Sequence, residues 1–260
     1  MAAALLPSRE EFLSEVAIPG SWTCIFVSGS IVAGWGHANS DLDIYVVTDK
    51  RLSIPSTAVL PVGGITPADV PVLEGFVDDR RWDVELWLED QVEQVLSKVT
   101  AVDMTEGGTT AALSPEHIDF LYRISIGVAL DGAEWLAEKQ RILAESQFRV
   151  LLAGRAFNDA DGWIDDAVGL LQSSDPRSAV LAAREAFTLV VDGLLASHGE
   201  FAPNHKWRAQ KMLRARPDEL RFEEYWAIET MRGLDPDDPS RWVVHVLEVC
   251  QRLMSEVDLG

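Results

Sequence analysis

The pattern of apolar and polar positions changes character near Glu89. Before that point, short runs rich in β-branched and aromatic residues predict buried strands at Cys24–Val27 and Leu42–Val47. Residues 50–71 are rich in proline and glycine, which excludes a long helix and predicts a loop with one short strand near Thr57–Val62. The first third of the chain therefore predicts the strands of a sheet.

Two further apolar runs, Val72–Val77 and Trp82–Leu88, flank the polar segment Asp78–Arg81. A short polar segment between two strand-like runs is typical of a tight connection between neighbouring strands. The pattern predicts an antiparallel hairpin with a four-residue turn, and the hairpin adds two strands to the sheet.

Beyond Glu89 the apolar residues recur three and four positions apart, which is typical of helices. Ser114 is suited to cap a helix that has Pro115 at its first position and Glu116 in its first turn. Asp175 and Pro176 repeat this arrangement. The later part of the chain therefore predicts a helical bundle, with helices at Gln147–Leu171, Ala179–Leu195, Lys206–Arg214, Pro217–Arg232 and Arg241–Val257.

The two patterns together predict an α+β protein. A mixed sheet flanked by helices comes first, and an all-α helical bundle follows. We place the domain boundary after residue 105, so that residues 1–105 form the first domain and residues 106–260 the second. A chain of 260 residues is long enough for each part to bury a core of its own.

Composition narrows the range of partners. The chain holds 22 Lys and Arg against 42 Asp and Glu, a formal net charge of −20. Proteins that bind nucleic acid need clustered cations against the phosphate backbone, so we expect no nucleic-acid partner. An acidic surface instead favours cationic ligands or metal ions.

The expected compartment follows from the absence of targeting signals. The N-terminal residues lack the basic segment and the apolar stretch of a signal peptide, and no window is apolar enough for a membrane span. The cysteines Cys24 and Cys250 lie far apart in apolar settings, as expected of buried thiols in a reducing environment. We therefore expect a cytoplasmic protein with no membrane partner.

The most informative stretch is Val27–Val47, which predicts a strand, a small-residue turn, a polar loop and a second strand. Asp41 and Asp43 stand two positions apart, so both project from one face of the second strand. Two carboxylates held so close are costly unless one is protonated or a cation lies between them, and a divalent ion satisfies that need. Gly29 allows a ligand to approach the backbone closely, and Ser30 offers an N–H and a hydroxyl to a phosphate oxygen.

This spacing resembles the signature of the DNA polymerase β-like nucleotidyltransferase superfamily. Gly29 and Ser30 are followed by ten residues and then by Asp41 and Asp43, which have apolar neighbours. The resemblance implies a nucleotidyltransferase core in which Gly29 and Ser30 contact the nucleotide. It also implies that Asp41 and Asp43 bind metal ions.

The resemblance further implies a third acidic residue on a later strand. The run Trp82–Leu88 offers Asp83 and Glu85, which share one face, so periodicity alone leaves both open. We favour Asp83 as the metal ligand or general base because it follows the hairpin turn directly. Glu85 remains the second candidate for the catalytic acid.

The long helical part narrows the resemblance to the small-molecule branch, which is typified by the aminoglycoside and lincosamide nucleotidyltransferases. In that branch the helical domain closes the active-site cleft. The segment Ala202–Leu213 is similar in style to a stretch that places a basic residue on the nucleotide phosphates. Lys206 and Lys211 are the implied phosphate-binding residues.

The implied reaction is transfer of a nucleoside monophosphate to a hydroxyl of a small molecule, with AMP from ATP as the expected donor pair. Two Mg²⁺ ions and a nucleoside triphosphate are the implied cofactor and co-substrate, and pyrophosphate leaves. The acidic balance of the chain favours a cationic acceptor such as an aminoglycoside-like molecule.

A second hypothesis belongs to another class of function. The chain is also similar to regulatory or antitoxin-type nucleotidyltransferases, which bind a partner protein or nucleotidylate it. Those proteins typically consist of a short core alone, so the long helical part favours the small-molecule enzyme. A stoichiometric protein partner that accepts a nucleotide label would reverse this preference.

Overall fold

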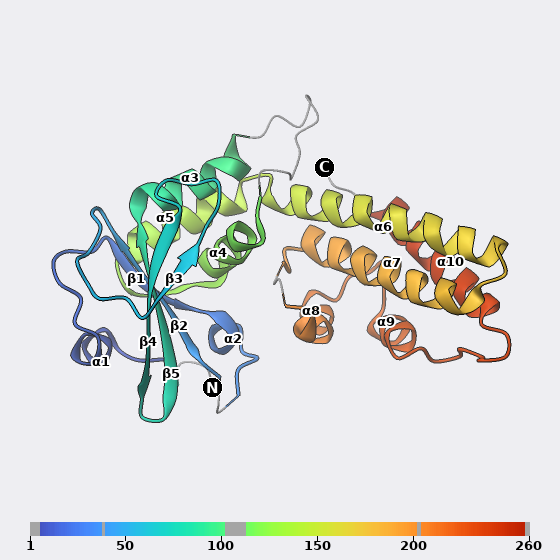
Figure 1. Ribbon diagram of the computed structural model, residues 1–260, viewed down its shortest axis with the longest axis horizontal. Coiled ribbons are helices and arrows are strands. Elements are labelled where there is room, and N and C mark those ends of the chain that lie inside the picture. The colour runs from blue at the N-terminus through green and yellow to red at the C-terminus, as the bar shows by residue number, and fades with distance from the viewer. Residues whose placement is uncertain (1–5, 38–39, 102–112, 202–203, 258–260) are drawn as a thin grey trace. The chain divides into compact units, whose positions relative to one another are not determined.

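The computed structural model describes residues 6–37, 40–101, 113–201 and 204–257 (Figure 1). It divides into two compact units, residues 1–147 and residues 148–260. The first unit contains a sheet with helices on both faces, and the second is all helical. The predicted α+β class is confirmed.

The first unit is built on a six-stranded mixed sheet with the strand order β3-β4-β5-β2-β1-β6. Strands β2 and β5 run parallel, whereas the other neighbouring pairs are antiparallel. Strands β1, β2 and β5 were expected from their apolar runs, and β2 and β5 lie side by side at the centre of the sheet. The strand bounds are β1 Cys24–Ser28, β2 Leu42–Thr48, β3 Ala58–Pro61, β4 Asp69–Val77, β5 Arg80–Leu88 and β6 Val128–Asp131.

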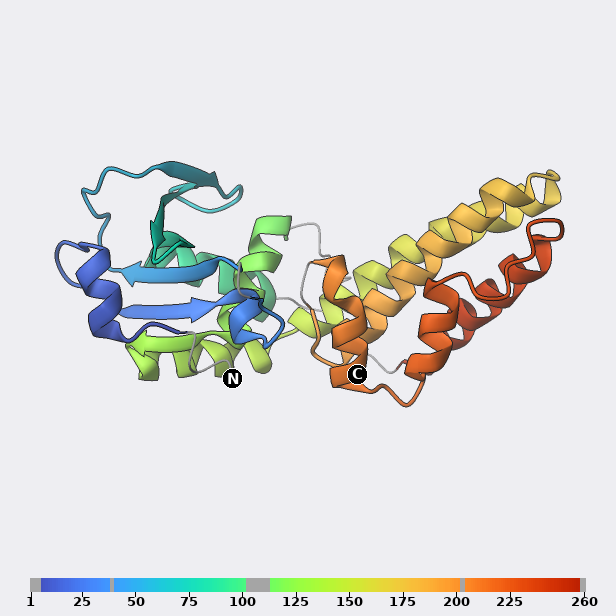
Figure 2. The same ribbon diagram turned by 90° about the horizontal axis from the view of Figure 1, so that it is seen from below.

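The two faces of the sheet are covered by different helices (Figure 2). Helix α1, Arg9–Glu15, covers one face, where Phe12 stacks on Trp82 with ring centroids 6.2 Å apart. On the opposite face, Phe120 of α4 stacks on Trp87 with ring centroids 3.6 Å apart. Helices α3 (Glu89–Thr100), α4 (Pro115–Ile126) and α5 (Ala133–Ala144) pack together on this second face. Every residue of β1 is therefore buried.

The hairpin between β4 and β5 has a two-residue turn, and the predicted four-residue turn is wrong. Asp78 and Asp79 both have positive φ, at 48° and 62°, and Val77 pairs with Arg80. Two successive residues with positive φ match the right-handed twist of the strands, and aspartate tolerates this conformation better than most residues. The shorter turn extends β5, so that Asp83 lies well inside the strand.

The segment that follows α4 belongs to the first unit. Strand β6 pairs with β1, and α5 packs against α3 and α4, although the sequence pattern predicted neither element. Strand β6 has only four residues, too few for a periodicity to show. The predicted boundary at 105/106 itself lies outside the described residues, and the compact units divide after Gln147 instead.

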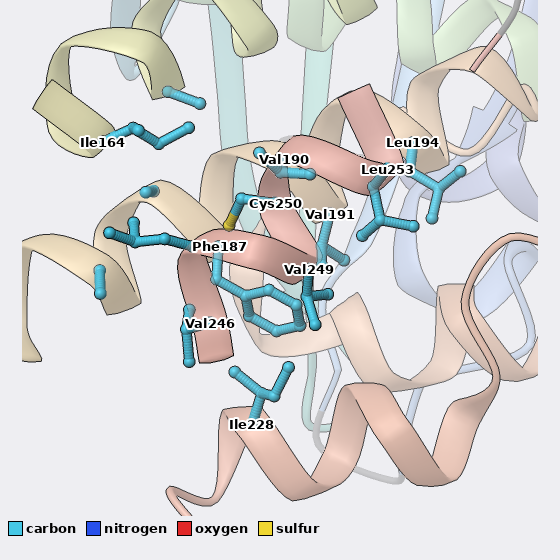
Figure 3. Close-up of a cluster of buried hydrophobic side chains, with 14 of the residues drawn as sticks. Ile164, Phe187, Val190, Val191, Leu194, Ile228, Val246, Val249, Cys250 and Leu253 are labelled. Atoms are coloured by element: carbon cyan, nitrogen blue, oxygen red, sulfur yellow. The ribbon is translucent and has the colours of Figure 1, made fainter. Parts of the chain in front are cut away.

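The second unit is built on the antiparallel pair α6 and α7, with α10 packed against them. A Cβ on Gly193 of α7 would stand 2.5 Å from the Phe157 ring, so glycine lets the two long helices approach closely. Figure 3 shows the core that α9 and α10 complete. The helix bounds are α6 Phe148–Gln172, α7 Pro176–Ser197, α8 Arg208–Ala215, α9 Phe222–Glu229 and α10 Ser240–Glu256, with a 3-10 turn at His205–Trp207. None of the helices in the described ranges is long and apolar enough to cross a bilayer.

Substitution Gly132→Ala is expected to destabilise the first unit by about 3 kcal/mol. Gly132 precedes α5 with φ 71°, and an added methyl group would overlap the backbone of Thr23 and Cys24. Urea unfolding measures the change. Gly20→Ala is the matched control, because Gly20 has φ 93° but open space around it, and should cost only about 1 kcal/mol. Equal effects of the two substitutions would contradict the packing argument.

Candidate active site

A row of polar residues crosses four neighbouring strands on the face that α4 covers. The strand register places Ser28 of β1 beside Asp43 of β2, Asp43 beside Asp83 of β5, and Asp83 beside Glu74 of β4. We call these four residues the polar row. Like charges on adjacent strands repel, so a row that contains three carboxylates needs cations close by.

Arg123 of α4 supplies the cation at one end of the polar row. Its Nη1 donates a hydrogen bond to Asp43 Oδ2 at 2.9 Å, and its Nε donates to Asp119 Oδ2 at 3.2 Å. Burial raises the pKa of Asp43, and the Arg123 guanidinium opposes that rise. Burial alone would lower the pKa of Arg123, but Tyr45, Asp43 and Asp119 together raise it, so this guanidinium stays charged.

Gly29 makes the contact between Asp43 and Arg123 possible. It lies at the end of β1 with φ 85°, at the start of the short helix α2, Gly29–Val32. A Cβ at this position would overlap the Asp43 carboxylate and stand 2.6 Å from Arg123 Nη1. The ion pair therefore occupies the space that a side chain at position 29 would fill. Ser30, the other predicted nucleotide contact, lies in the first turn of α2.

Arg81 of β5 supplies the second cation. Its Nε donates to Asp83 Oδ1 at 2.9 Å and its Nη2 donates to Glu74 Oε1 at 2.6 Å. Burial raises the pKa of Asp83, Arg81 lowers it, and the nearby charge of Asp41 raises it again. Asp41 itself is exposed just before β2. The structure thus brings Asp43 and Asp83 into register, with Asp41 close enough to influence Asp83.

Glu85, the second candidate for the third acid, lies one step deeper on the same face. It is opposite Tyr45 in the strand register and accepts a hydrogen bond from Trp87 Nε1 at 2.8 Å. Burial raises its pKa to about 7, and the nearby Asp119 contributes to the rise. Glu85 therefore changes its ionisation near neutral pH, unlike an exposed glutamate.

The donor chemistry of these acids fits a hard cation such as Mg²⁺, which takes oxygen ligands. The register holds Asp43 and Asp83 side by side, and each forms an ion pair with an arginine. Within the described ranges, no three His, Cys, Asp or Glu side chains gather into a ready-made metal site. A divalent ion bound by Asp41, Asp43 and Asp83 would therefore compete with Arg123 and Arg81 for Asp43 and Asp83.

The two predicted phosphate-binding lysines belong to the second unit. Lys206 is exposed, with its Nζ 5.1 Å from the centroid of the Trp207 ring. Lys211 is only 2% exposed, and burial lowers its pKa to about 8 although Asp192 opposes that shift. Arg208 forms a bidentate ion pair with Asp192, at 2.8 and 2.9 Å, in the same buried cluster. A role of Lys206 and Lys211 in nucleotide binding stays a prediction.

Sequence reasoning missed Glu74, Arg81, Asp119 and Arg123 as members of the site. Asp119 and Arg123 stand four residues apart in a helix that the sequence predicted, which is a recognisable ion-pair spacing. Nothing in that spacing indicates that the helix packs on the acidic face of β2. Glu74 and Arg81 could have been found only from the register of the hairpin, which a two-residue turn sets.

Comparisons with known proteins support the fold. No family model matches the sequence, and no curated protein matches it. Among solved structures, a nucleotidyltransferase-like protein from Exiguobacterium sibiricum 255-15 is similar, with a TM-score of 0.51 and 13% sequence identity. The match covers 97% of this chain and 76% of that chain. At this identity the likeness shows that the chain has a nucleotidyltransferase-like fold.

Substitution Gly29→Ala is expected to break the contact between Asp43 and Arg123 and to destabilise the first unit by about 3 kcal/mol. The methyl group would occupy the space of the Asp43 carboxylate, at a φ of 85° that alanine disfavours. Urea unfolding measures the loss. Gly34→Ala is the control, since Gly34 has φ 80° and open space. A loss at Gly29 no larger than at Gly34 would contradict this geometry.

Substitution Glu85→Gln is expected to make the protein more stable at pH 8, by about 2 kcal/mol, and to change it less at pH 5. The pKa of Glu85 is raised in the fold to about 7, so its favourable protonated form is lost as pH rises through 7. Glutamine stays neutral and can still accept from Trp87.

The measurement is urea unfolding of both proteins at the two pH values. Glu134→Gln, at an exposed position of α5, controls for the loss of one carboxylate. A Glu85→Gln protein that is less stable than the wild type at pH 8 would show that the ionised form is the favoured one.

Proposed function

We propose that the protein is a Mg²⁺-dependent nucleotidyltransferase that transfers AMP from ATP to a hydroxyl of a small, cationic acceptor. The observation that carries this proposal is the position of Asp43 and Asp83 in register beside Gly29, within a nucleotidyltransferase-like fold. A pair of carboxylates can bind metal ions, and a neighbouring glycine lets a ligand come close to the backbone. Together these features suit a metal-bound triphosphate.

The proposed metal ligands are Asp41, Asp43 and Asp83. Two Mg²⁺ ions, when bound, would neutralise the triphosphate and make the acceptor hydroxyl more acidic. Asp43 lies in a partly buried position, where a carboxylate interacts more strongly with a cation than in water. Asp83 shares its place in the register, so both side chains reach one region of the sheet. Phosphoryl transfer needs mainly this positioning and charge neutralisation.

Asp83 is the favoured general base for the acceptor hydroxyl, and the register supports the choice. Asp83 is directly beside Asp43, whereas Glu85 is beside Tyr45 and one step further from Asp43. A pKa of about 7 would nevertheless suit Glu85 to accept a proton at neutral pH. The two acids are therefore best separated by experiment.

Gly29 and Ser30 are the proposed contacts for the nucleotide in the first unit. Lys206 and Lys211 of the second unit are the proposed contacts for its phosphates, and the helical unit is the proposed closing domain. The net charge of −20 supports a cationic acceptor and argues against nucleic acid, because an acidic protein concentrates cations at its surface. We keep the cytoplasm as the expected compartment.

The test is turnover of labelled ATP with a panel of hydroxyl-bearing aminoglycoside-like amines, together with binding of Mg²⁺ and nucleotide. Asp41→Asn and Asp43→Asn should each weaken Mg²⁺-dependent nucleotide binding and abolish turnover, since each removes a proposed metal ligand. Asp83→Asn should lower turnover at least about a hundredfold while nucleotide binding persists, in line with the usual size of general-base effects.

Asp49→Asn is the matched control, because Asp49 is exposed directly after β2 and its loss changes the net charge equally. Normal turnover in Asp83→Asn together with a collapse in Glu85→Gln would assign the base to Glu85. Undiminished Mg²⁺-dependent nucleotide binding in Asp41→Asn and Asp43→Asn would overturn the metal assignment.

A further inference from the structure

Arg123 is held between two carboxylates that lie on different elements. Its Nη1 binds Asp43 of β2 and its Nε binds Asp119 of its own helix, at 2.9 and 3.2 Å. The side chain of Arg123 is 20% exposed and that of Asp119 is 36% exposed. Asp43 thus lies on the inner side of this arrangement, against Gly29, and Asp119 lies on its more exposed side.

A guanidinium at this position competes with any other cation for Asp43. Its hydrogen bond occupies Asp43 Oδ2, and its charge repels a divalent ion brought to the same carboxylate. Asp119 offers Arg123 a second anionic partner one helical turn away, so Arg123 can leave Asp43 without losing all compensation for its charge.

The backbone of α4 is anchored independently of the Arg123 side chain. Ser28 Oγ of β1 donates a hydrogen bond to the backbone carbonyl of Arg123 at 2.8 Å. Phe120 of the same helix stacks on Trp87 of β5. The side chain of Arg123 can therefore move while the helix stays in place.

From this geometry we infer that Arg123 is a positioning residue that holds Asp43 in the absence of a divalent cation and shifts to Asp119 when the cation binds. The inference rests on the proposed function, since it needs a metal site at Asp43. It adds that Arg123 competes with the divalent cation for Asp43. This competition sets the cation concentration that is needed to occupy the site.

The test is the affinity of the full-length protein for Mn²⁺ alone, measured at pH 8 from the electron paramagnetic resonance signal of the free ion. Arg123→Gln should bind Mn²⁺ at least about tenfold more tightly than the wild type, because the competing charge is gone. Asp119→Asn should bind it more weakly, because Arg123 then has Asp43 as its remaining partner of the two.

A double-mutant cycle separates this role from simple loss of charge. If Asp119 acts through Arg123, then Asp119→Asn should have little effect once Arg123→Gln is present. Arg141→Gln and Glu145→Gln are the matched controls, since these residues form an exposed ion pair with the same four-residue spacing at the C-terminal end of α5. Both controls should bind Mn²⁺ like the wild type.

Circular dichroism and thermal unfolding check that each variant is folded, and Asp119→Asn alone carries the test if Arg123→Gln does not fold. Mn²⁺ binding that is unchanged or weaker in a folded Arg123→Gln protein overturns the inference. Mn²⁺ binding in Asp119→Asn that is as tight as in the wild type also overturns it. In both cases the proposed function stands as long as the wild type binds the metal. If neither the wild type nor any variant binds Mn²⁺, the metal site itself is wrong, and the inference falls with it.

Discussion

The first unit is organised around the partial burial of carboxylates on a sheet face that a helix covers. Asp43 and Asp83 lie in register on parallel strands, on the face that α4 covers. Carboxylates taken out of water must be paired, because an isolated buried charge costs far more than an exposed one. The positions of Arg123 and Arg81 follow from this constraint.

The same constraint explains why the face divides into an aromatic part and a charged part. Phe26, Tyr45 and Trp87 stack with one another or with Phe120 of α4, which excludes water from one end of the face. The polar row lies at the other end, where its carboxylates keep about a quarter or more of their surface exposed. Exclusion of water strengthens electrostatic interactions, and partial exposure of the carboxylates lets a charged ligand reach them. A binding site for a charged ligand needs both properties.

A likeness of fold at 13% identity does not carry an activity with it. The case for nucleotidyl transfer depends on local features of this chain: a glycine whose missing side chain makes room for a carboxylate, and acids that the register brings together. The second unit solves a similar problem in a similar way, since its half-buried Asp192 is neutralised by the buried Arg208. In both units an arginine therefore pairs with a partly buried aspartate.

The sequence by itself determined the strands with strong apolar runs, the long helices, and the motif of Gly29, Ser30, Asp41 and Asp43. These signals are local, because side-chain alternation, helix caps and spacing depend on residues that are close in the chain. The sequence pattern did not predict short elements such as β6 and α1, since four to seven residues carry little periodicity. The sequence also did not predict the boundary after Gln147, because α5 belongs to the first unit through its packing on β1, α3 and α4, which a local pattern does not show.

Only the tertiary structure decided which charges meet. The pairing of Asp43 with Arg123 joins residues 80 positions apart, and the alignment of Glu74 with Asp83 depends on the two-residue turn at Asp78 and Asp79. A register change of one residue would send those side chains to the opposite face. The sequence predicted the acidic residues of the site. The arginines that compensate their charge became evident only from the packing, because charge pairing depends on distance in space.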